Sequence, residues 1–193
     1  MSGTEMSHSR IERSRARILD AAQDVIGETG YDAATVDAIA TRAGLTRKTV
    51  YNHFPSKEAV ADAVVARAGA QAEPLYGAAI RAGMPALDLL VAILGDSAEW
   101  CVANPDLARR ALAPRLRPTA VPPDRGSFQG IVVDAMQFGQ SQGVIRSDED
   151  AGFLSLVLLG LYAQAMLSAL DAGGIEAGEI GRIVRIAVEG IGT

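Results

Sequence analysis

Residues 43–57, AGLTRKTVYNHFPSK, combine side chains that can bind phosphates with side chains that can read base edges. Both lysines of the chain, Lys48 and Lys57, lie in this block, together with Arg47 and Tyr51 and without any acid. An arginine can donate paired hydrogen bonds to guanine, and lysine, hydroxyl and amide groups can hold the backbone in register. These residue types therefore indicate nucleic-acid recognition. The alternative is that Arg47 and Lys48 form a solvated surface and that Tyr51 and His53 merely pack against their neighbours.

Charge is distributed unevenly along the chain. The net charge of −5 argues against a protein that coats nucleic acid with its whole surface. Residues 1–57 contain eight basic and seven acidic residues, whereas residues 58–193 contain ten basic and sixteen acidic ones. No acid occurs between Asp37 and Glu58. Positive charge is thus concentrated locally. The basic residues in that interval are Arg42, Arg47, Lys48 and Lys57.

One longer helix and two short ones are predicted to position this block. Ser9 to Glu12 has the form of a capping box, so we expect a first helix from there to Gly30, preceded by a disordered tail over residues 1–8. Thr35 caps a second helix that Gly44 ends, and Thr46 caps a third that runs to about His53. Helices this short are unstable alone and must pack on the first. The prediction is a helix-turn-helix whose second helix suits the major groove. Its inward residues are Ile39, Ala40, Leu45, Val50 and Phe54, and its outward residues are Arg47, Lys48, Tyr51 and Asn52.

The run from Gly30 to Ala59 resembles the DNA-binding region of the TetR family of bacterial transcriptional regulators. The similar parts are Thr35-Val36, Ile39-Ala40, Ala43-Gly44-Leu45, Tyr51, His53-Phe54 and Ser56-Lys57-Glu58. The resemblance covers about the first third of the chain. It implies an all-α homodimer with one helix-turn-helix per subunit and a C-terminal domain for ligand binding and dimerisation.

From these observations we expect an all-α chain with a DNA-binding domain in residues 1–57 and a ligand-binding and dimerisation domain in residues 58–193. The expected function is transcriptional regulation in the cytoplasm, by a repressor that binds a palindromic operator on double-stranded DNA as a homodimer. A small, largely apolar effector of unknown identity would release it. The DNA-facing candidates are Thr35, Thr46, Arg47, Lys48, Thr49, Tyr51, Asn52, His53 and Lys57.

Prolines divide residues 60–193 into further helical segments, over about 85–103, 105–113, 127–143 and 176–190, with a loop at 114–126. The segment 151–170 carries no charge, so a membrane span has to be weighed. Ser155, Gln164, Ser168 and acidic flanks weigh against it, and we expect no membrane partner. A helix apolar on all sides is otherwise buried in a core or between subunits.

We expect the segments 151–170 and 176–190 of two subunits to form a four-helix dimer interface. Small residues at Gly160, Ala163, Gly181 and Ala187 would let the helices approach closely. An apolar and aromatic set is predicted to line the effector pocket, although core packing explains the same residues and is the favoured explanation for any single one of them. Its members are Tyr76, Met84, Leu87, Trp100, Phe128, Met136, Phe138, Tyr162 and Met166.

Catalysis is not expected, because the chain has no phosphate-binding glycine loop, no His/carboxylate cluster and no nucleophile motif. Cys101 is the single cysteine, and with two histidines it is too little for a zinc cluster. No cofactor and no metal are predicted. Two alternatives stay open, a membrane-associated helical regulator and a transcriptional activator of the same fold.

Overall fold

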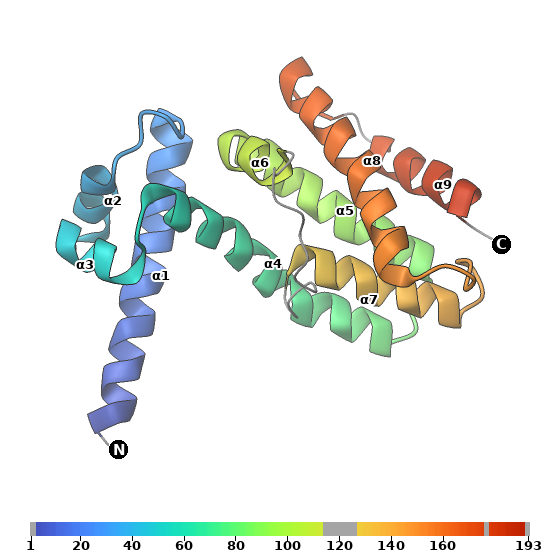
Figure 1. Ribbon diagram of the computed structural model, residues 1–193, viewed down its shortest axis with the longest axis horizontal. Helices are drawn as coiled ribbons and strands as arrows, with labels where there is room; N and C mark the ends of the chain where they lie inside the picture. The colour runs from blue at the N-terminus through green and yellow to red at the C-terminus, as the bar shows by residue number, and fades with distance from the viewer. Residues whose placement is uncertain (1–2, 114–126, 176–177, 192–193) are drawn as a thin grey trace. The chain divides into compact units, whose positions relative to one another are not determined.

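The computed structural model describes residues 3–113, 127–175 and 178–191, and every regular element in these ranges is an α-helix (Figure 1). The predicted loop at 114–126 lies outside the described residues. The helices are α1 (Gly3–Thr29), α2 (Val36–Ala43), α3 (Arg47–His53), α4 (Lys57–Arg81), α5 (Ala86–Ala103), α6 (Pro105–Leu112), α7 (Phe128–Ser141), α8 (Ala151–Ala172) and α9 (Glu179–Ile191).

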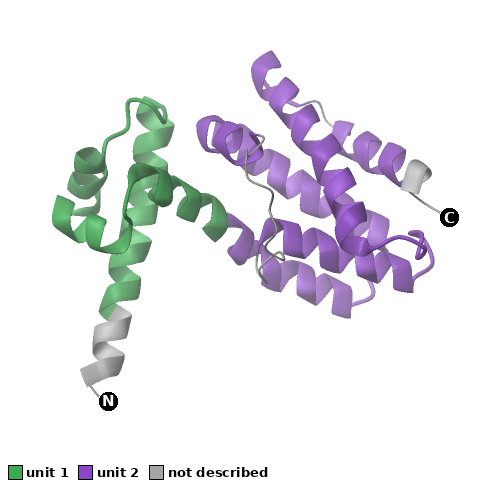
Figure 2. Ribbon diagram, viewed as in Figure 1, with its two compact units in different colours: residues 1–67 green, residues 68–193 purple. Residues whose placement is uncertain are grey.

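The chain divides into two compact units, Met1–Arg67 and Ala68–Thr193 (Figure 2). The sequence placed a boundary at residues 57 and 58, where α4 begins. The first turns of α4 belong to unit 1 because Val60, Ala61 and Val64 are buried. Arg67 adds an ion pair to Asp20 of α1 at 2.5 Å. The division therefore falls inside α4, ten residues after the expected boundary.

The disordered tail expected at residues 1–8 is wrong for residues 3–8, since α1 begins at Gly3. Packing of Ile18, Ala22 and Ile26 makes the central part of α1 helical. Extending an existing helix adds one hydrogen bond for each residue fixed, and residues 3–8 contain no proline to stop it. The capping pattern at Ser9 therefore lies inside the helix. Residues 1 and 2 lie outside the described residues.

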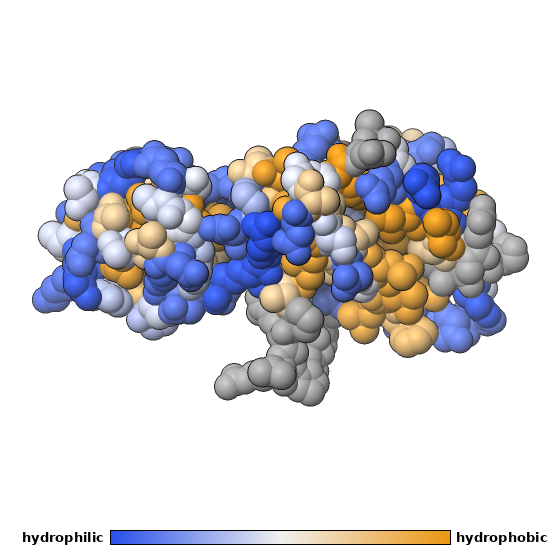
Figure 3. Space-filling view, turned by 90° about the horizontal axis from the view of Figure 1, so that it is seen from above, coloured by the Kyte–Doolittle hydropathy of each residue, from blue (hydrophilic) through white to orange (hydrophobic). Residues whose placement is uncertain are grey.

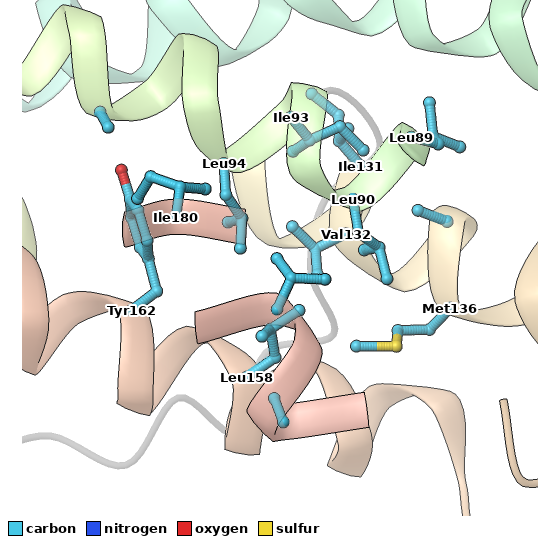
Figure 4. Close-up of a cluster of buried hydrophobic side chains, with 14 of the residues drawn as sticks. Leu89, Leu90, Ile93, Leu94, Ile131, Val132, Met136, Leu158, Tyr162 and Ile180 are labelled. Atoms are coloured by element: carbon cyan, nitrogen blue, oxygen red, sulfur yellow. The ribbon is translucent and has the colours of Figure 1, made fainter. Parts of the chain in front are cut away.

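Unit 2 is organised around α5, which packs against α6, α7, α8 and α9. Its core is a single cluster of aliphatic side chains with a few larger ones from α7 and α8 (Figure 4). Leu90 and Leu94 of α5, Met136 of α7 and Leu158 of α8 are all fully buried. Burial of these side chains supplies the main stabilising free energy of the unit.

Helix α8 has one buried face and one exposed apolar face. Leu158, Tyr162 and Met166 are completely buried, whereas Phe153 is 55% and Leu156 is 52% exposed. Among the described residues, α8 is the one helix long and apolar enough to cross a membrane, by length and composition only. In Figure 3, apolar side chains gather on the exposed surface of unit 2, while unit 1 shows a mainly hydrophilic face.

Candidate nucleic-acid interface

A tight turn at Gly44 joins α2 to α3. Gly44 has φ 62°, a left-handed conformation that favours glycine, and its N–H donates to the Thr41 carbonyl at 3.0 Å. The Leu45 N–H donates to the Ala40 carbonyl at 2.9 Å. These bonds satisfy carbonyls that the end of α2 leaves open. The turn is therefore fixed in geometry, as the sequence predicted.

Threonine hydroxyls cap both short helices. The Thr35 side chain accepts a hydrogen bond from the Ala38 N–H at 3.1 Å, and Thr46 accepts one from the Thr49 N–H at 3.1 Å. Each cap satisfies an orphan donor of the first turn. Thr46 and Thr49 also share a hydroxyl contact at 2.9 Å. The three threonines named as DNA-facing candidates thus shape the two helices, while a hydroxyl that accepts can still donate to a phosphate.

Helix α3 turns one face inward and one outward. Val50 is fully buried and Phe54, its C-cap residue, is 4% exposed. The side chains on the opposite face are exposed. The exposed side chains are those that the sequence predicted to face outward, namely Arg47, Lys48, Tyr51 and Asn52.

Two arginines of α1 brace this arrangement, and sequence reasoning missed both. The Arg17 guanidinium donates to the Ala43 carbonyl and lies 3.4 Å from the Gly44 carbonyl. Arg15 stacks over the Phe54 ring with its guanidinium carbon 4.6 Å from the ring centroid. Helix α1 thus holds the turn at one end of α3 and the cap residue at the other. Contacts between residues that are 26 and 39 positions apart leave no local spacing signal in a sequence.

Lys57 has a folding role in this structure. Its ammonium donates to the carbonyls of Tyr31 at 2.8 Å and Ala34 at 3.0 Å, with Asp32 O at 3.3 Å. It also lies 4.4 Å from the centroid of the Tyr31 ring. Lys57 therefore ties the turn between α1 and α2 to the first turn of α4. A phosphate contact by the same ammonium stays a prediction.

Acids of α1 pair with Arg42, a basic residue of the acid-free interval between Asp37 and Glu58. Arg42 makes paired bonds to Glu28 of α1 at 2.9 and 2.5 Å, and Asp24 lies 3.8 Å away. These bonds raise the pKa of Arg42 and lower the pKa of Glu28. Lys48 is exposed, and within the described part of the chain it makes no hydrogen bond or ion pair. Although residues 38–57 contain no acid, acidic side chains from elsewhere in the chain therefore lie beside basic residues of this interval.

Arg47 joins a small network on the outward face. It donates to Asp37 of α2 at 2.8 Å and lies 3.4 Å from the Tyr51 hydroxyl. The hydrogen bond to Tyr51 and the charge of Asp37 raise the pKa of Arg47. His53 is half-buried at the end of α3, with its ring centroid 6.3 Å from that of Phe54. The exposed face therefore presents Arg47, which is bound to Asp37 and Tyr51, beside Lys48, which has no bonded partner among the described residues.

The predicted effector residues are only partly brought together. Seven lie in the core cluster of unit 2 or pack against it, but Met84 and Leu87 are 38% and 36% exposed. The Tyr162 hydroxyl donates to Ser97 at 2.8 Å inside this apolar cluster. Cys101 is buried, and burial raises the pKa of its thiol. The seven residues are Tyr76, Trp100, Phe128, Met136, Phe138, Tyr162 and Met166.

Comparison with known proteins points to one family. The model of bacterial regulatory proteins of the tetR family matches residues 18–76. The transcriptional regulator SrpR of Pseudomonas putida is 49% identical over 55 residues, which is 28% of this chain and 26% of SrpR. The transcriptional repressor Rv1474c of Mycobacterium tuberculosis is 30% identical over 108 residues, or 55% of each chain. The chain thus spans between about a quarter and about half of the length of these relatives.

Solved structures extend the likeness in fold to 91% of the chain. The fatty acid degradation regulator FadR of Bacillus halodurans has a TM-score of 0.69 at 18% identity, covering 91% of this chain and 98% of that one. The FadR repressor of Thermus thermophilus, solved with lauroyl-CoA, has a TM-score of 0.69 at 21% identity and covers 91% of both chains. The expected all-α class and the family resemblance are confirmed.

Replacing Gly44 by alanine tests the turn. The left-handed backbone would cost an alanine about 1–2 kcal/mol, and its Cβ would lie 2.8 Å from the Arg17 guanidinium. We expect the free energy of unfolding, measured in urea, to fall by at least that amount. Gly27→Ala in α1 is the control, because its Cβ meets no atom within 4 Å and helix propensity predicts a gain of about 0.5–1 kcal/mol. Equal effects of the two variants would contradict this account of the turn.

The two lysines should separate folding from binding. Lys57→Ala removes a charged donor from three carbonyls, so we expect the free energy of unfolding to fall by about 1–3 kcal/mol. Lys48→Ala changes an exposed side chain and should stay within about 0.5 kcal/mol of the parent. Urea unfolding followed by circular dichroism measures both. A fully stable Lys57→Ala protein would show that the carbonyl contacts contribute nothing.

Proposed function

The chain belongs to the TetR family of bacterial regulatory proteins through its N-terminal region, and we propose that it is a transcriptional regulator whose α3 enters the major groove of duplex DNA. The observation that carries the proposal is the outward face of α3. This face presents Arg47, Lys48, Tyr51 and Asn52 to solvent on a helix whose other side is fixed in the core of unit 1. A rigid support allows side chains to meet base edges in a fixed register.

Each candidate has a role that its position supports. Arg47 suits paired hydrogen bonds to guanine, and the free ammonium of Lys48 suits a base or a phosphate. The hydroxyls at the start of α2 and α3 suit phosphate oxygens, because helix N-termini favour anions. Tyr51, Asn52 and His53 complete the backbone contacts, whereas Lys57 would reach a phosphate only by leaving its carbonyls.

We place the homodimer interface on the exposed apolar face of α8 together with α9. Phe153, Leu156 and Leu161 on α8 and Ile186 on α9 are about half exposed or more, and burying them would be favourable. A Cβ on Gly160 or Gly181 would meet nothing within 4 Å, which leaves room for a close partner helix. Ala187 is buried within its own subunit, so its expected place in the interface is wrong. Two recognition helices related by a dyad would read a palindrome with additive free energies.

A small, largely apolar effector is proposed to release the protein from its operator. The core of unit 2 that would receive it is apolar, with the Tyr162 and Ser97 hydroxyls as polar points. Two of the solved structures of similar fold are FadR regulators in complex with lauroyl-CoA and stearoyl-CoA. The ligand acts by population shift, because it binds better to the conformation that fits DNA poorly.

Repression in the cytoplasm, without catalysis and without membrane contact, is part of the same proposal. The face of α8 that holds Leu158, Tyr162 and Met166 is packed into the unit 2 core, and a bilayer would have to replace that packing. Activation of transcription by the same fold stays the alternative, since the position of the operator relative to a promoter decides the sign.

Selection of bound sequences from random duplex DNA tests the proposal. We expect enriched sequences with two half-sites related by a dyad and separated by about 34–36 Å or a multiple of that distance. The reason is that each subunit of a dimer presents one α3. Sequences without enrichment, or a protein that sediments as a monomer at micromolar concentration, would contradict the proposal.

A matched pair of variants then separates base reading from charge. Arg47→Ala should weaken binding to the selected site by about 1–3 kcal/mol and relax the preference at one base pair. Lys48→Ala removes the same charge from the neighbouring position and should leave that particular base preference intact. Loss of the same preference in both variants would mean that Arg47 does not read a base.

A further inference from the structure

Asp37 places a carboxylate on the surface that the proposed function turns toward DNA. It lies in the first turn of α2, is 63% exposed, and accepts a hydrogen bond from the Arg47 guanidinium at 2.8 Å. Arg47 is itself 59% exposed, so the pair lies at the surface where a duplex would approach. An acid in this position repels phosphates, so it lowers the attraction of this surface for any duplex.

The guanidinium of Arg47 is held from two sides. The Arg47 Nη1 group donates to the Asp37 carboxylate, and the Nη2 group lies 3.4 Å from the Tyr51 hydroxyl. The guanidinium carbon also lies 5.4 Å from the centroid of the Tyr51 ring. Because a guanidinium has five N–H donors in a planar fork, donors remain for a base while the bond to Asp37 persists. A contact with Asp37 therefore restricts where Arg47 can point without blocking it.

We propose that Asp37 is a specificity-determining residue that keeps Arg47 from binding phosphates on non-cognate DNA. This inference rests on the DNA-binding function proposed above. On a random sequence, a phosphate that reached the remaining Arg47 donors would lie close to the Asp37 carboxylate, and the two negative charges would repel each other unless the Arg47–Asp37 bond were lost. On the cognate site the guanine acceptors receive the remaining donors, and the Arg47–Asp37 pair stays together. Asp37 thus lowers non-specific binding more than specific binding.

Lys48 makes the contrast clear. It is the neighbouring cation and, among the described residues, it has no such acid partner, so it is free to bind any phosphate. The two adjacent residues therefore have different roles in DNA binding. Lys48 supplies affinity for any duplex, whereas Arg47 is reserved for a site that offers acceptors in the right geometry.

The test compares the full-length parent protein with Asp37→Asn on a duplex carrying the selected site and on a random duplex. We expect binding to the random duplex to tighten by about three-fold or more at 0.1 M salt and the salt dependence to steepen by about one phosphate contact. Binding to the selected site should change less than two-fold, so the ratio of the two affinities falls. Asp32→Asn, which removes an equal charge from an exposed acid outside the Arg47 network, should leave the ratio unchanged.

Variants that lack Arg47 show whether Asp37 acts through it. In an Arg47→Ala background, Asp37→Asn should no longer change the ratio, because no guanidinium is left to release. A ratio that Asp37→Asn leaves unchanged in the parent would overturn the inference while leaving DNA binding intact. An equal fall in the Arg47→Ala background would also overturn it, since Asp37 would then act as a bare charge. If the parent protein bound both duplexes equally well, the result would instead contradict the proposed function, which is sequence-specific DNA binding.

Discussion

The structure of unit 1 depends on holding a seven-residue helix in place. Helix α3 runs from Arg47 to His53, which is too short to persist alone in water. Val50 and Phe54 anchor it in the core, and Arg17 of α1 holds the carbonyl at the end of α2. The outward face is rigid only because these inward contacts exist. A recognition surface on a helix of this length is therefore a property of the whole three-helix unit.

Several basic residues of unit 1 make contacts within the protein and are therefore less available to bind a ligand. Arg15, Arg17 and Lys57 bind a ring or carbonyls, and Arg42 is paired with Glu28. Charge counted along the sequence therefore overstates what the surface offers to phosphates. The residue left for an unselective contact on α3 is Lys48, beside an arginine that an acid restrains. Such a surface suits a protein that must ignore most of the DNA it meets.

The sequence predicted what local rules control. The caps at Thr35 and Thr46, the turn at Gly44 and the inward position of Val50 follow from propensity and spacing, and the structure has them all. Tertiary contacts such as that of Lys57 with the Tyr31 carbonyl were missed, because no periodic pattern encodes them. The prediction of a disordered tail before Ser9 was wrong for a related reason. A capping pattern does not mark the start of a helix when packing of later residues allows the helix to extend past it.

In unit 2 the sequence showed how apolar a segment is but not which side faces inward. Residues 151–170 have no charge, so their periodicity could not separate the buried face at Leu158 from the exposed face at Phe153. The effector candidates show the same limit, because an aromatic residue such as Tyr162 fills a core and a pocket equally well in sequence. Packing geometry alone distinguishes these cases, and it is a property of the folded chain.

The proposed position of α3 in the major groove is tested most directly by methylation of the bound duplex with dimethyl sulfate, which attacks guanine N7 in the major groove and adenine N3 in the minor groove. The account predicts protection of guanine N7 in two patches about one helical turn apart, or a multiple of it, and loss of one protected guanine per patch in Arg47→Ala. Protection confined to adenine N3, or guanine protection that Arg47→Ala leaves unchanged, would contradict it.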